Sequence, residues 1–258
     1  MERKLEEKYG LTEALIAVPA YEQSSDQEVA FQAVDYILRV LKKNMVFGMT
    51  WGRAMHEFVE QLAKDERLRS LSFQNVKVVP FLGTPGAIQS DSWNTTTYSN
   101  TLATKVGNLL HCASYNLSAP MYVEGTKEKE LIESIDEIAK VLHMAETADI
   151  ALIGIGSMQD DSSIIKAEIR TKEEYKELVR KGAVGEIVGR IYDKNGQTVD
   201  EDLKRKMVGI SLDKIAKIPV RVGMSYGKDK IEAIKGAIAG GLVNVLVTDV
   251  PTAELLLK

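Results

Sequence analysis

Short apolar runs that are rich in β-branched residues alternate along the chain with longer amphipathic segments. Residues 149–153 (DIALI) and 243–247 (VNVLV) are runs of the first kind, whereas residues 26–43 carry apolar side chains at helical spacing. A run that is apolar throughout is typical of a strand buried in a parallel sheet, and successive parallel strands are joined by helices. The alternation therefore predicts an α/β fold, in which a Rossmann-like, mostly parallel sheet is flanked by helices.

Individual elements follow from periodicity and from residues that start or end helices. Strands are predicted at residues 14–18, 45–47, 76–81, 149–153, 184–192, 219–224 and 243–247, with a short strand before Pro120. Helices are predicted at residues 26–43, 51–63, 98–110, 127–142, 171–180, 228–239 and 251–257. Asp26 is the expected N-cap of the first of these, Thr171 and Glu174 have capping-box spacing, and Asn195-Gly196 predicts a hairpin turn.

Nothing in the 258 residues divides the chain into separate domains, since it has no low-complexity linker and no internal repeat. A chain of this length can bury a substantial core in one α/β unit. We expect a main domain with a small inserted lobe, either between roughly residues 83 and 125 or near residues 185–210.

Composition excludes several classes of function. No apolar run approaches the length that crosses a bilayer, and the opening MERKLEEK lacks the apolar stretch of a secretory signal. A cytoplasmic protein without a membrane partner is therefore expected. The net charge is −4, whereas binding to a phosphate backbone needs clustered Lys and Arg. The chain itself is not expected to bind DNA.

The cysteine and histidine content predicts no metal site. Cys112 is the one cysteine and follows an apolar stretch, so we interpret it as a buried structural thiol. His56, His111 and His143 have no metal-ligand spacing with one another or with Cys112. We therefore expect neither a structural zinc ion nor catalysis by the thiol.

Ligands of open parallel sheets bind outside the carboxyl ends of the strands, so the loops after the strands are the candidates. In residues 48–53 (GMTWGR), Gly48 permits close backbone approach and Thr50 offers a hydroxyl and an amide at a helix start. Such a loop can cradle a phosphate, although it can also be a tight turn capped by Thr50. It does not match GxxxxGK[ST], so ATP hydrolysis is not predicted.

Two further loops follow later strands. Residues 154–159 (GIGSMQ) begin like a dinucleotide-binding loop, but Gln159 stands where the third glycine would be, so NAD is weakly supported and no cofactor is expected. Residues 182–186 (GAVGE) end in Glu186, whose carboxylate can accept hydrogen bonds from sugar hydroxyls. The alternative for Glu186 is a surface ion pair with Arg190.

The last loop, residues 227–234 (GKDKIEAI), places Lys230 at the start of a predicted helix. Unpaired amides and the positive end of the helix dipole favour an anion there, and Lys230 adds a formal charge. The alternative is a solvated lysine on an ordinary first turn. Together the loops supply a cationic pole, a cradle and a carboxylate, which suits a phosphorylated sugar.

In this order, the segments resemble the effector domain of the SorC family (SorC/DeoR-type) of bacterial transcriptional regulators over residues 11–257. The segments that carry the resemblance are residues 48–52, Asn100, residues 153–156 (IGIG), 182–186 (GAVGE), 189–193 (GRIYD), 227–234 and 246–253 (LVTDVPTA). The resemblance implies a fold like that of ribose-phosphate isomerases and glucosamine-phosphate deaminases, used to sense a ligand instead of turning it over. The alternative function is such an isomerase or deaminase.

The resemblance also implies roles for particular residues. The effector phosphate is expected at Gly48, Thr50, Trp51, Gly52 and Lys230. The effector sugar is expected at Gly83, Asn100, Gly156 and Glu186. No residue is assigned a catalytic role.

Partners follow from the same resemblance. Residues 1–258 are expected to form the effector-binding domain of a homo-oligomer, a dimer or a tetramer. Members of the family normally begin with a helix-turn-helix, whereas this sequence opens with MERKLEEKYGL and leaves no room for one, so operator DNA is expected to bind only through an N-terminal domain that is missing from this chain.

The chain departs from the family pattern at Val250, where a glutamate is common, so a contact from that position is lost. Some members join their sugar to a lysine as an imine, which needs a lysine held in the pocket. Residues 82–104 contain no lysine. We therefore expect noncovalent binding.

Overall fold

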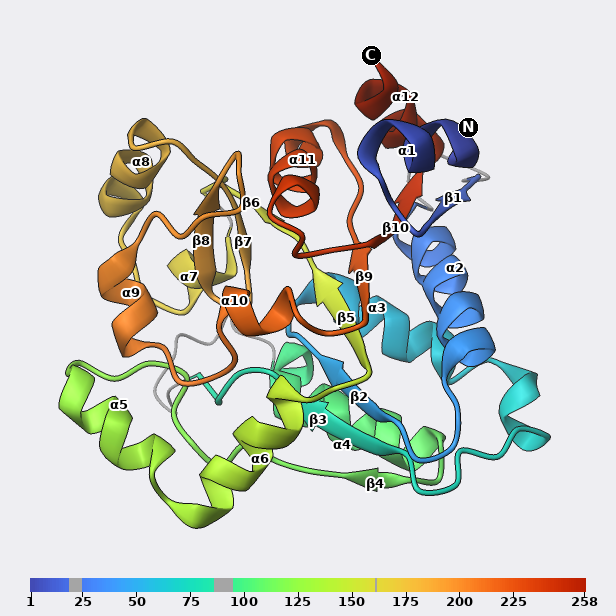
Figure 1. Cartoon of the computed structure of the whole chain (residues 1–258), viewed down its shortest axis with the longest axis horizontal. Coiled ribbons are helices and arrows are strands. Elements are labelled where there is room, and N and C mark those ends of the chain that lie inside the picture. Colours follow the sequence, from blue (N-terminus) through green and yellow to red (C-terminus); the bar gives the residue numbers. More distant parts are fainter. Residues whose placement is uncertain (19–24, 86–94, 161) are drawn as a thin grey trace.

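The main sheet has seven parallel strands in the order β1-β10-β9-β5-β2-β3-β4. The structure is a computed structural model, which describes residues 1–18, 25–85, 95–160 and 162–258. The strands are β1 (Glu13–Ala17), β2 (Val46–Met49), β3 (Lys77–Pro80), β4 (Ala113–Ser114), β5 (Ile150–Gly154), β9 (Val220–Met224) and β10 (Val245–Asp249). The predicted α/β class and the parallel sheet are confirmed (Figure 1).

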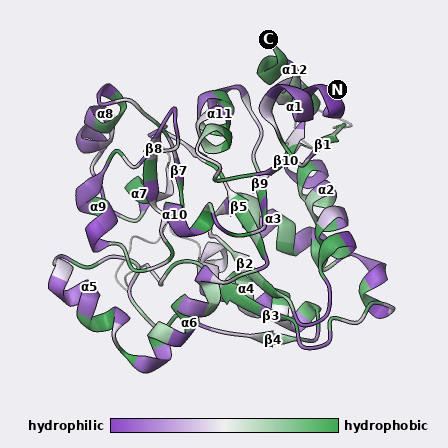
Figure 2. Ribbon diagram, viewed as in Figure 1, coloured by the Kyte–Doolittle hydropathy of each residue, from purple (hydrophilic) through white to green (hydrophobic). Residues whose placement is uncertain are grey.

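Helices cover both faces of this sheet because its strands are apolar on both sides. Phe47, Met49 and Leu152 pack in one cluster with the first layer of helices, whereas Ala151 and Ile153 pack in a second cluster on the opposite face. The first layer is α2 (Ser25–Val40), α3 (Arg53–Leu62) and α4 (Ser99–Leu109); the second contains α1 (Glu2–Tyr9), α6 (Asp136–Glu146), α10 (Leu212–Ile215), α11 (Ile231–Ala239) and α12 (Val250–Leu257). Figure 2 shows the main strands in apolar colours, whereas peripheral α1 is mainly polar.

A small lobe follows β5 and packs against α11 (Figure 1, yellow to orange). It contains the antiparallel strands β6 (Gly156–Ser157), β7 (Ala183–Ile187) and β8 (Arg190–Asp193), with α7 (Ser163–Lys166), α8 (Lys172–Arg180) and α9 (Glu201–Lys206). Ile187 and Ile234 belong to one apolar cluster, and the buried Tyr192 hydroxyl donates to the Ala233 carbonyl over 2.9 Å. The lobe therefore shares the core of the main domain.

The lobe overlaps only the second of its two predicted positions. Residues 95–125 instead supply α4 and β4 to the main sheet and its helix layer, and residues 86–94 lie outside the described residues. The lobe begins near Gly156, where the chain leaves β5, because β6 pairs with β7 and not with the main sheet.

Two predicted elements are each divided in the structure. The helix predicted at residues 127–142 is α5 (Thr126–Glu133) followed by α6, because Ile135 has extended backbone torsions and serves as the N-cap of α6. The strand predicted at residues 184–192 is the hairpin β7-β8. Its turn is at Val188 and Gly189, both of which have positive φ angles.

Several local predictions can be checked against the helix ends and turns. The Thr171 capping box is present at α8, and Gly196 has positive φ in a turn where the Asp193 amide donates to the Gln197 carbonyl. Asp26 is not an N-cap, because α2 begins at Ser25. The Asp26 carboxylate instead accepts a hydrogen bond from the Tyr226 hydroxyl.

Cys112 is half-buried, and burial raises the pKa of its thiol to about 11. The thiol is therefore protonated near neutral pH and a poor nucleophile. Within the described ranges, no group of three or more His, Cys, Asp or Glu side chains could hold a metal ion. None of the helices described there is both long enough and apolar enough to span a membrane.

Candidate ligand-binding site

A cavity of about 650 Å³ lies beyond the carboxyl ends of β2, β5 and β9. The chain leaves adjacent β2 and β5 in opposite directions, since β2 leads to β3 on one side and β5 leads through the lobe to β9 on the other. Such a reversal leaves a crevice between the connections, which is where α/β sheets bind ligands. The fold therefore places the cavity where strand order predicts it.

Two helical segments begin at this cavity without a side-chain cap. Gly52 precedes α3, and Gly227 precedes the short 3-10 turn η4 (Lys228–Lys230) that leads into α11. Both glycines have positive φ angles, 107° and 106°, which residues with a Cβ rarely adopt. The amides of a first helical turn have no partner within the helix, so both segments favour an anion.

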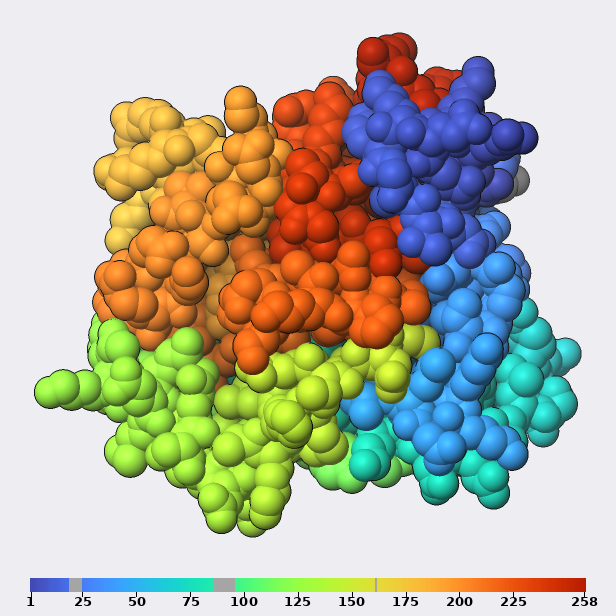
Figure 3. Space-filling model, viewed as in Figure 1, coloured from blue at the N-terminus to red at the C-terminus, as the bar shows by residue number. Residues whose placement is uncertain are grey.

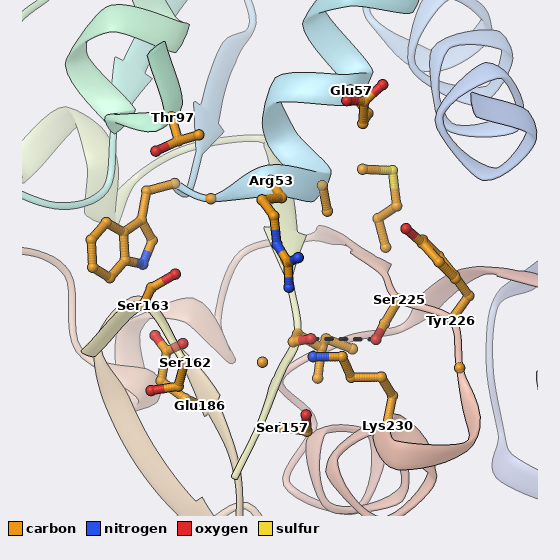
Figure 4. A pocket seen from close by; sticks show the side chains of 18 of the residues that line it. Arg53, Glu57, Thr97, Ser157, Ser162, Ser163, Glu186, Ser225, Tyr226 and Lys230 are labelled. Carbon is orange, nitrogen blue, oxygen red and sulfur yellow. Dashed lines mark hydrogen bonds between the residues drawn. The ribbon is translucent and has the colours of Figure 1, made fainter. Parts of the chain in front are cut away.

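Arg53 and Lys230 add positive charge at these two helix starts. Their side chains approach each other from opposite walls of the cavity (Figure 4). The Lys230 Nζ atom lies 3.9 Å from Asp229 Oδ2, and the side chain of Lys230 is 25% exposed. Two cations and the carboxylate of Asp229 therefore meet at this end of the cavity, where Lys230 is partly shielded from water.

Glu186 of β7 supplies an acid to the same cavity and is only 6% exposed. Burial raises the pKa of its carboxyl, whereas hydrogen bonds from the Gly189 amide and the Trp51 indole and the charge of Lys230 oppose this rise. Gly156 lies against it, because a Cβ at that position would be 2.8 Å from Glu186 Oε2. Glu186 is thus held in place and can accept a ligand hydroxyl.

Other polar side chains of the cavity were missed in the sequence. Ser157 Oγ donates to Asp229 Oδ2 over 2.9 Å, and Lys166 reaches the cavity from α7. Ser157 follows Gly156 and Asp229 precedes Lys230, so adjacency to a predicted site residue is the sequence signal for both. His56, on α3, has a buried Nδ1 atom with no hydrogen-bond partner among the described residues. Its position one turn into a helix gave no sequence signal.

Five of the nine predicted site residues line the cavity. These are Trp51, Gly52, Gly156, Glu186 and Lys230. The alternative for Glu186, a surface ion pair with Arg190, is wrong, because both side chains are buried. Arg190 instead donates to the carbonyls of Val188, Met207 and Gly209.

Gly48 and Thr50 lie beneath the cavity and connect parts of the fold. Gly48 is inside β2, where a Cβ would be 2.0 Å from the Phe81 ring. Thr50 is 1% exposed; its amide donates to the Leu152 carbonyl over 3.1 Å, and its Oγ1 accepts from the Gly154 amide over 3.0 Å. The amide predicted to meet a phosphate is therefore used to join β2 to β5.

Gly83 and Asn100 are also absent from the cavity lining. Asn100 Nδ2 donates to Thr84 Oγ1 and to the Leu117 carbonyl, and its Oδ1 accepts from the Leu117 amide. At Gly83 a Cβ would lie 2.6 Å from the Ala119 carbonyl oxygen. Both residues fix loops beside α4, and this geometry gives them a packing role.

The raised pKa of Glu186 predicts a pH dependence of stability. Because the folded-state pKa exceeds the ordinary value of 4.5, the folded protein keeps a proton that the unfolded chain releases. This contribution to stability is fully present below the unfolded-state pKa and is lost as pH rises toward the folded-state pKa, by about 1.4 kcal/mol per pH unit. Glu186→Gln removes the titration. In denaturant unfolding, the free energy of the variant minus that of the wild type should increase above about pH 5, and a constant difference would contradict the assignment.

Known proteins resemble the chain over its whole length. The family model Sugar-bind, described as "Putative sugar-binding domain", matches residues 1–258. The sorbitol operon regulator of Klebsiella pneumoniae is 30% identical over 262 residues, which covers 100% of this chain and 80% of that protein. The deoxyribonucleoside regulator of Bacillus subtilis is 25% identical, and the match covers 98% of this chain and 78% of that protein.

Solved structures show the same relationship. The full-length sorbitol operon regulator SorC from Klebsiella pneumoniae has a TM-score of 0.88 and 28% identity, with 100% of this chain and 80% of that chain covered. A probable sor operon regulator from Shigella flexneri has a TM-score of 0.87 and 26% identity, with 100% and 98% covered.

Proposed function

The chain belongs to the sugar-binding domain family of SorC/DeoR-type transcriptional regulators, and from this premise we propose that it senses a phosphorylated sugar, which it binds noncovalently. The phosphate would lie between the starts of α3 and η4, and the sugar would extend toward Glu186. Gly52 and Trp51 belong to the phosphate end of this arrangement, and Gly156 to the sugar end.

The observation that carries the proposal is the convergence of Arg53 and Lys230 on two helix starts within one cavity. Backbone amides and two side-chain cations are the usual protein partners of a phosphate. The carboxylate of Glu186 lies on the same cavity and would accept hydroxyl hydrogen bonds, whereas Asp229 Oδ2 lies 3.9 Å from Lys230 Nζ, at the phosphate end. Because a carboxylate repels a phosphate, Glu186 would favour the orientation in which the sugar hydroxyls face it.

Regulation is the function that the relatives' names support, since they are operon or transcriptional regulators. An isomerase or deaminase would need a general base within reach of the reacting proton. One oxygen of Glu186 accepts a hydrogen bond from the Gly189 amide, and a carboxylate held in this way suits hydrogen bonding to a ligand hydroxyl. We therefore propose that the chain does not turn its ligand over and that it is cytoplasmic.

Assembly and DNA binding complete the proposal. The chain would act within a homo-oligomer, and operator DNA would be bound by a separate domain of the regulator. Binding of the sugar can change DNA affinity only if the two arrangements of subunits bind the sugar with different affinity.

A thermal-shift screen with matched pairs of phosphorylated and unphosphorylated sugars tests the proposal. A ligand that binds only the folded state adds about 2.7 kcal/mol of stability at a hundred times its Kd. We expect at least one phosphorylated sugar to raise the Tm by several degrees and its unphosphorylated partner to have little effect. Each stabilising sugar should be recovered unchanged after incubation, and conversion to an isomer or loss of ammonia would instead establish an enzyme. No shift with any phosphorylated sugar would refute the proposed ligand.

A further inference from the structure

A second crevice, of about 310 Å³, lies between α5, α9 and α10. These three elements meet on the face shown in Figure 3. None of the described residues that line it lines the first cavity. The proposed sugar site does not account for this crevice or for the charged residues inside it.

Arg190 forms part of the crevice wall and is only 2% exposed. Its two terminal nitrogens donate to the carbonyls of Val188, Met207 and Gly209 over 3.1 to 3.2 Å. Its Nε atom is buried and has no hydrogen-bond partner among the residues that the structure describes. A buried guanidinium N–H without a partner is uncommon and unfavourable, so the crevice contains an unmet donor.

The charges of the inner wall are unbalanced. Arg190 is buried and Lys129 and Glu133 are half-buried, whereas the side chain of Lys204 is 43% exposed and its Nζ lies 3.4 Å from Glu201 Oε2. Lys129 Nζ lies 3.7 Å from Glu133 Oε1 and donates to the Lys204 carbonyl over 3.4 Å. Burial lowers the pKa of Lys129, and the charge of Arg190 adds to this lowering. Glu133 therefore faces two shielded cations, Arg190 and Lys129, whereas Lys204 has a carboxylate partner of its own.

The rim and one hydroxyl complete the crevice. Glu130, Asp213 and Arg205 are exposed, so water and salt screen their charges more than those of the inner wall. Ser211 lies before α10, and its side chain makes no capping hydrogen bond. The interior thus offers cations and a hydroxyl to a small group that carries negative charge.

We propose that this crevice is a second ligand site, which binds the phosphate or carboxylate group of a small metabolite. An oxyanion there would accept a hydrogen bond from Arg190 Nε and balance the excess positive charge of Arg190 and Lys129. Charge-assisted bonds of this kind are the strong ones inside proteins. The site would allow the regulator to respond to an anion other than its sugar.

The test uses Lys230→Ala protein, in which the first cavity has lost one of its cations, and follows the ¹⁵N–¹H resonance of Arg190 Nε. Inorganic phosphate and, in parallel, acetate are added at constant ionic strength. A saturable shift of this resonance is expected, and the anion that produces it identifies the group bound. The double variant Lys129→Gln/Lys204→Gln should weaken binding by about tenfold or more.

Lys206→Gln is the matched control, because Lys206 lies on α9 but does not line the crevice. This control should bind the anion as tightly as the parent protein. A shift that never saturates with either anion, or an equal loss of affinity in the control, would overturn the proposal. If the double variant fails to fold, the Arg190 resonance in the Lys230→Ala protein still shows whether the anion binds in the crevice. The readout reports on the crevice itself, so a first cavity that binds no phosphate would leave this result unaffected.

Discussion

Lys230→Ala is expected to weaken binding of the most stabilising phosphorylated sugar by roughly tenfold to a hundredfold, and to leave its unphosphorylated counterpart nearly unaffected. Lys230 is partly shielded from water and faces Arg53 across the cavity. An ion pair in such a place is screened less than one on an open surface, so its loss has a larger effect. Isothermal titration calorimetry with both sugars measures the two affinities.

Lys228→Ala is the control for this prediction. Lys228 lies in the same short turn as Lys230, but it is exposed and does not line the cavity. Its removal changes the net charge equally and should alter affinity little. An equal loss in the two variants would show that only general electrostatic attraction is at work. A loss in Lys230→Ala that is the same for both sugars would place Lys230 against the sugar and not the phosphate.

The strands and most helices could be predicted because their signals are local. Buried parallel strands appear as continuous apolar runs. The spacing of Thr171 and Glu174 predicts a capping box from neighbouring residues alone. Lys230 could be found for a related reason, since it follows a glycine-containing loop at the end of a predicted strand, whereas Glu186 is singled out by the GAVGE segment and lies within the antiparallel strand β7. Parallel topology then brings such loops to one edge of the sheet.

The failures arose where distant packing decides the conformation. Helical periodicity continues through Ser134 and Ile135, and no proline or glycine marks the break between α5 and α6. The β7-β8 turn contains Val188 at positive φ, which a β-branched residue rarely adopts, so residue preferences argue against a turn there. The roles of Asn100 and Gly83 depend on Leu117 and Ala119, whose proximity no local pattern reveals.

Gly48 shows the same limit most clearly, because a glycine at a strand end suits both a phosphate loop and close packing. Gly48→Ala is expected to destabilise the protein by about 2 to 3 kcal/mol. The new Cβ would lie 2.0 Å from a carbon of the Phe81 ring, and that ring is fully buried and cannot move aside freely. The lower entropy of the unfolded alanine chain offsets only about 0.4 to 1 kcal/mol of this. Chemical denaturation of the ligand-free protein measures the change.

Phe81→Leu separates packing from ligand binding at Gly48. Leucine removes the ring carbons that the new Cβ would meet, at a cost of its own for the smaller side chain. If packing is the role of Gly48, the double variant should be more stable than the sum of the single changes predicts, by roughly 1 to 2 kcal/mol. Its affinity for the phosphorylated sugar should also remain close to that of the wild type. Strict additivity of the two changes, or a Gly48→Ala protein that keeps its stability but loses phosphate-dependent binding, would return Gly48 to the ligand site.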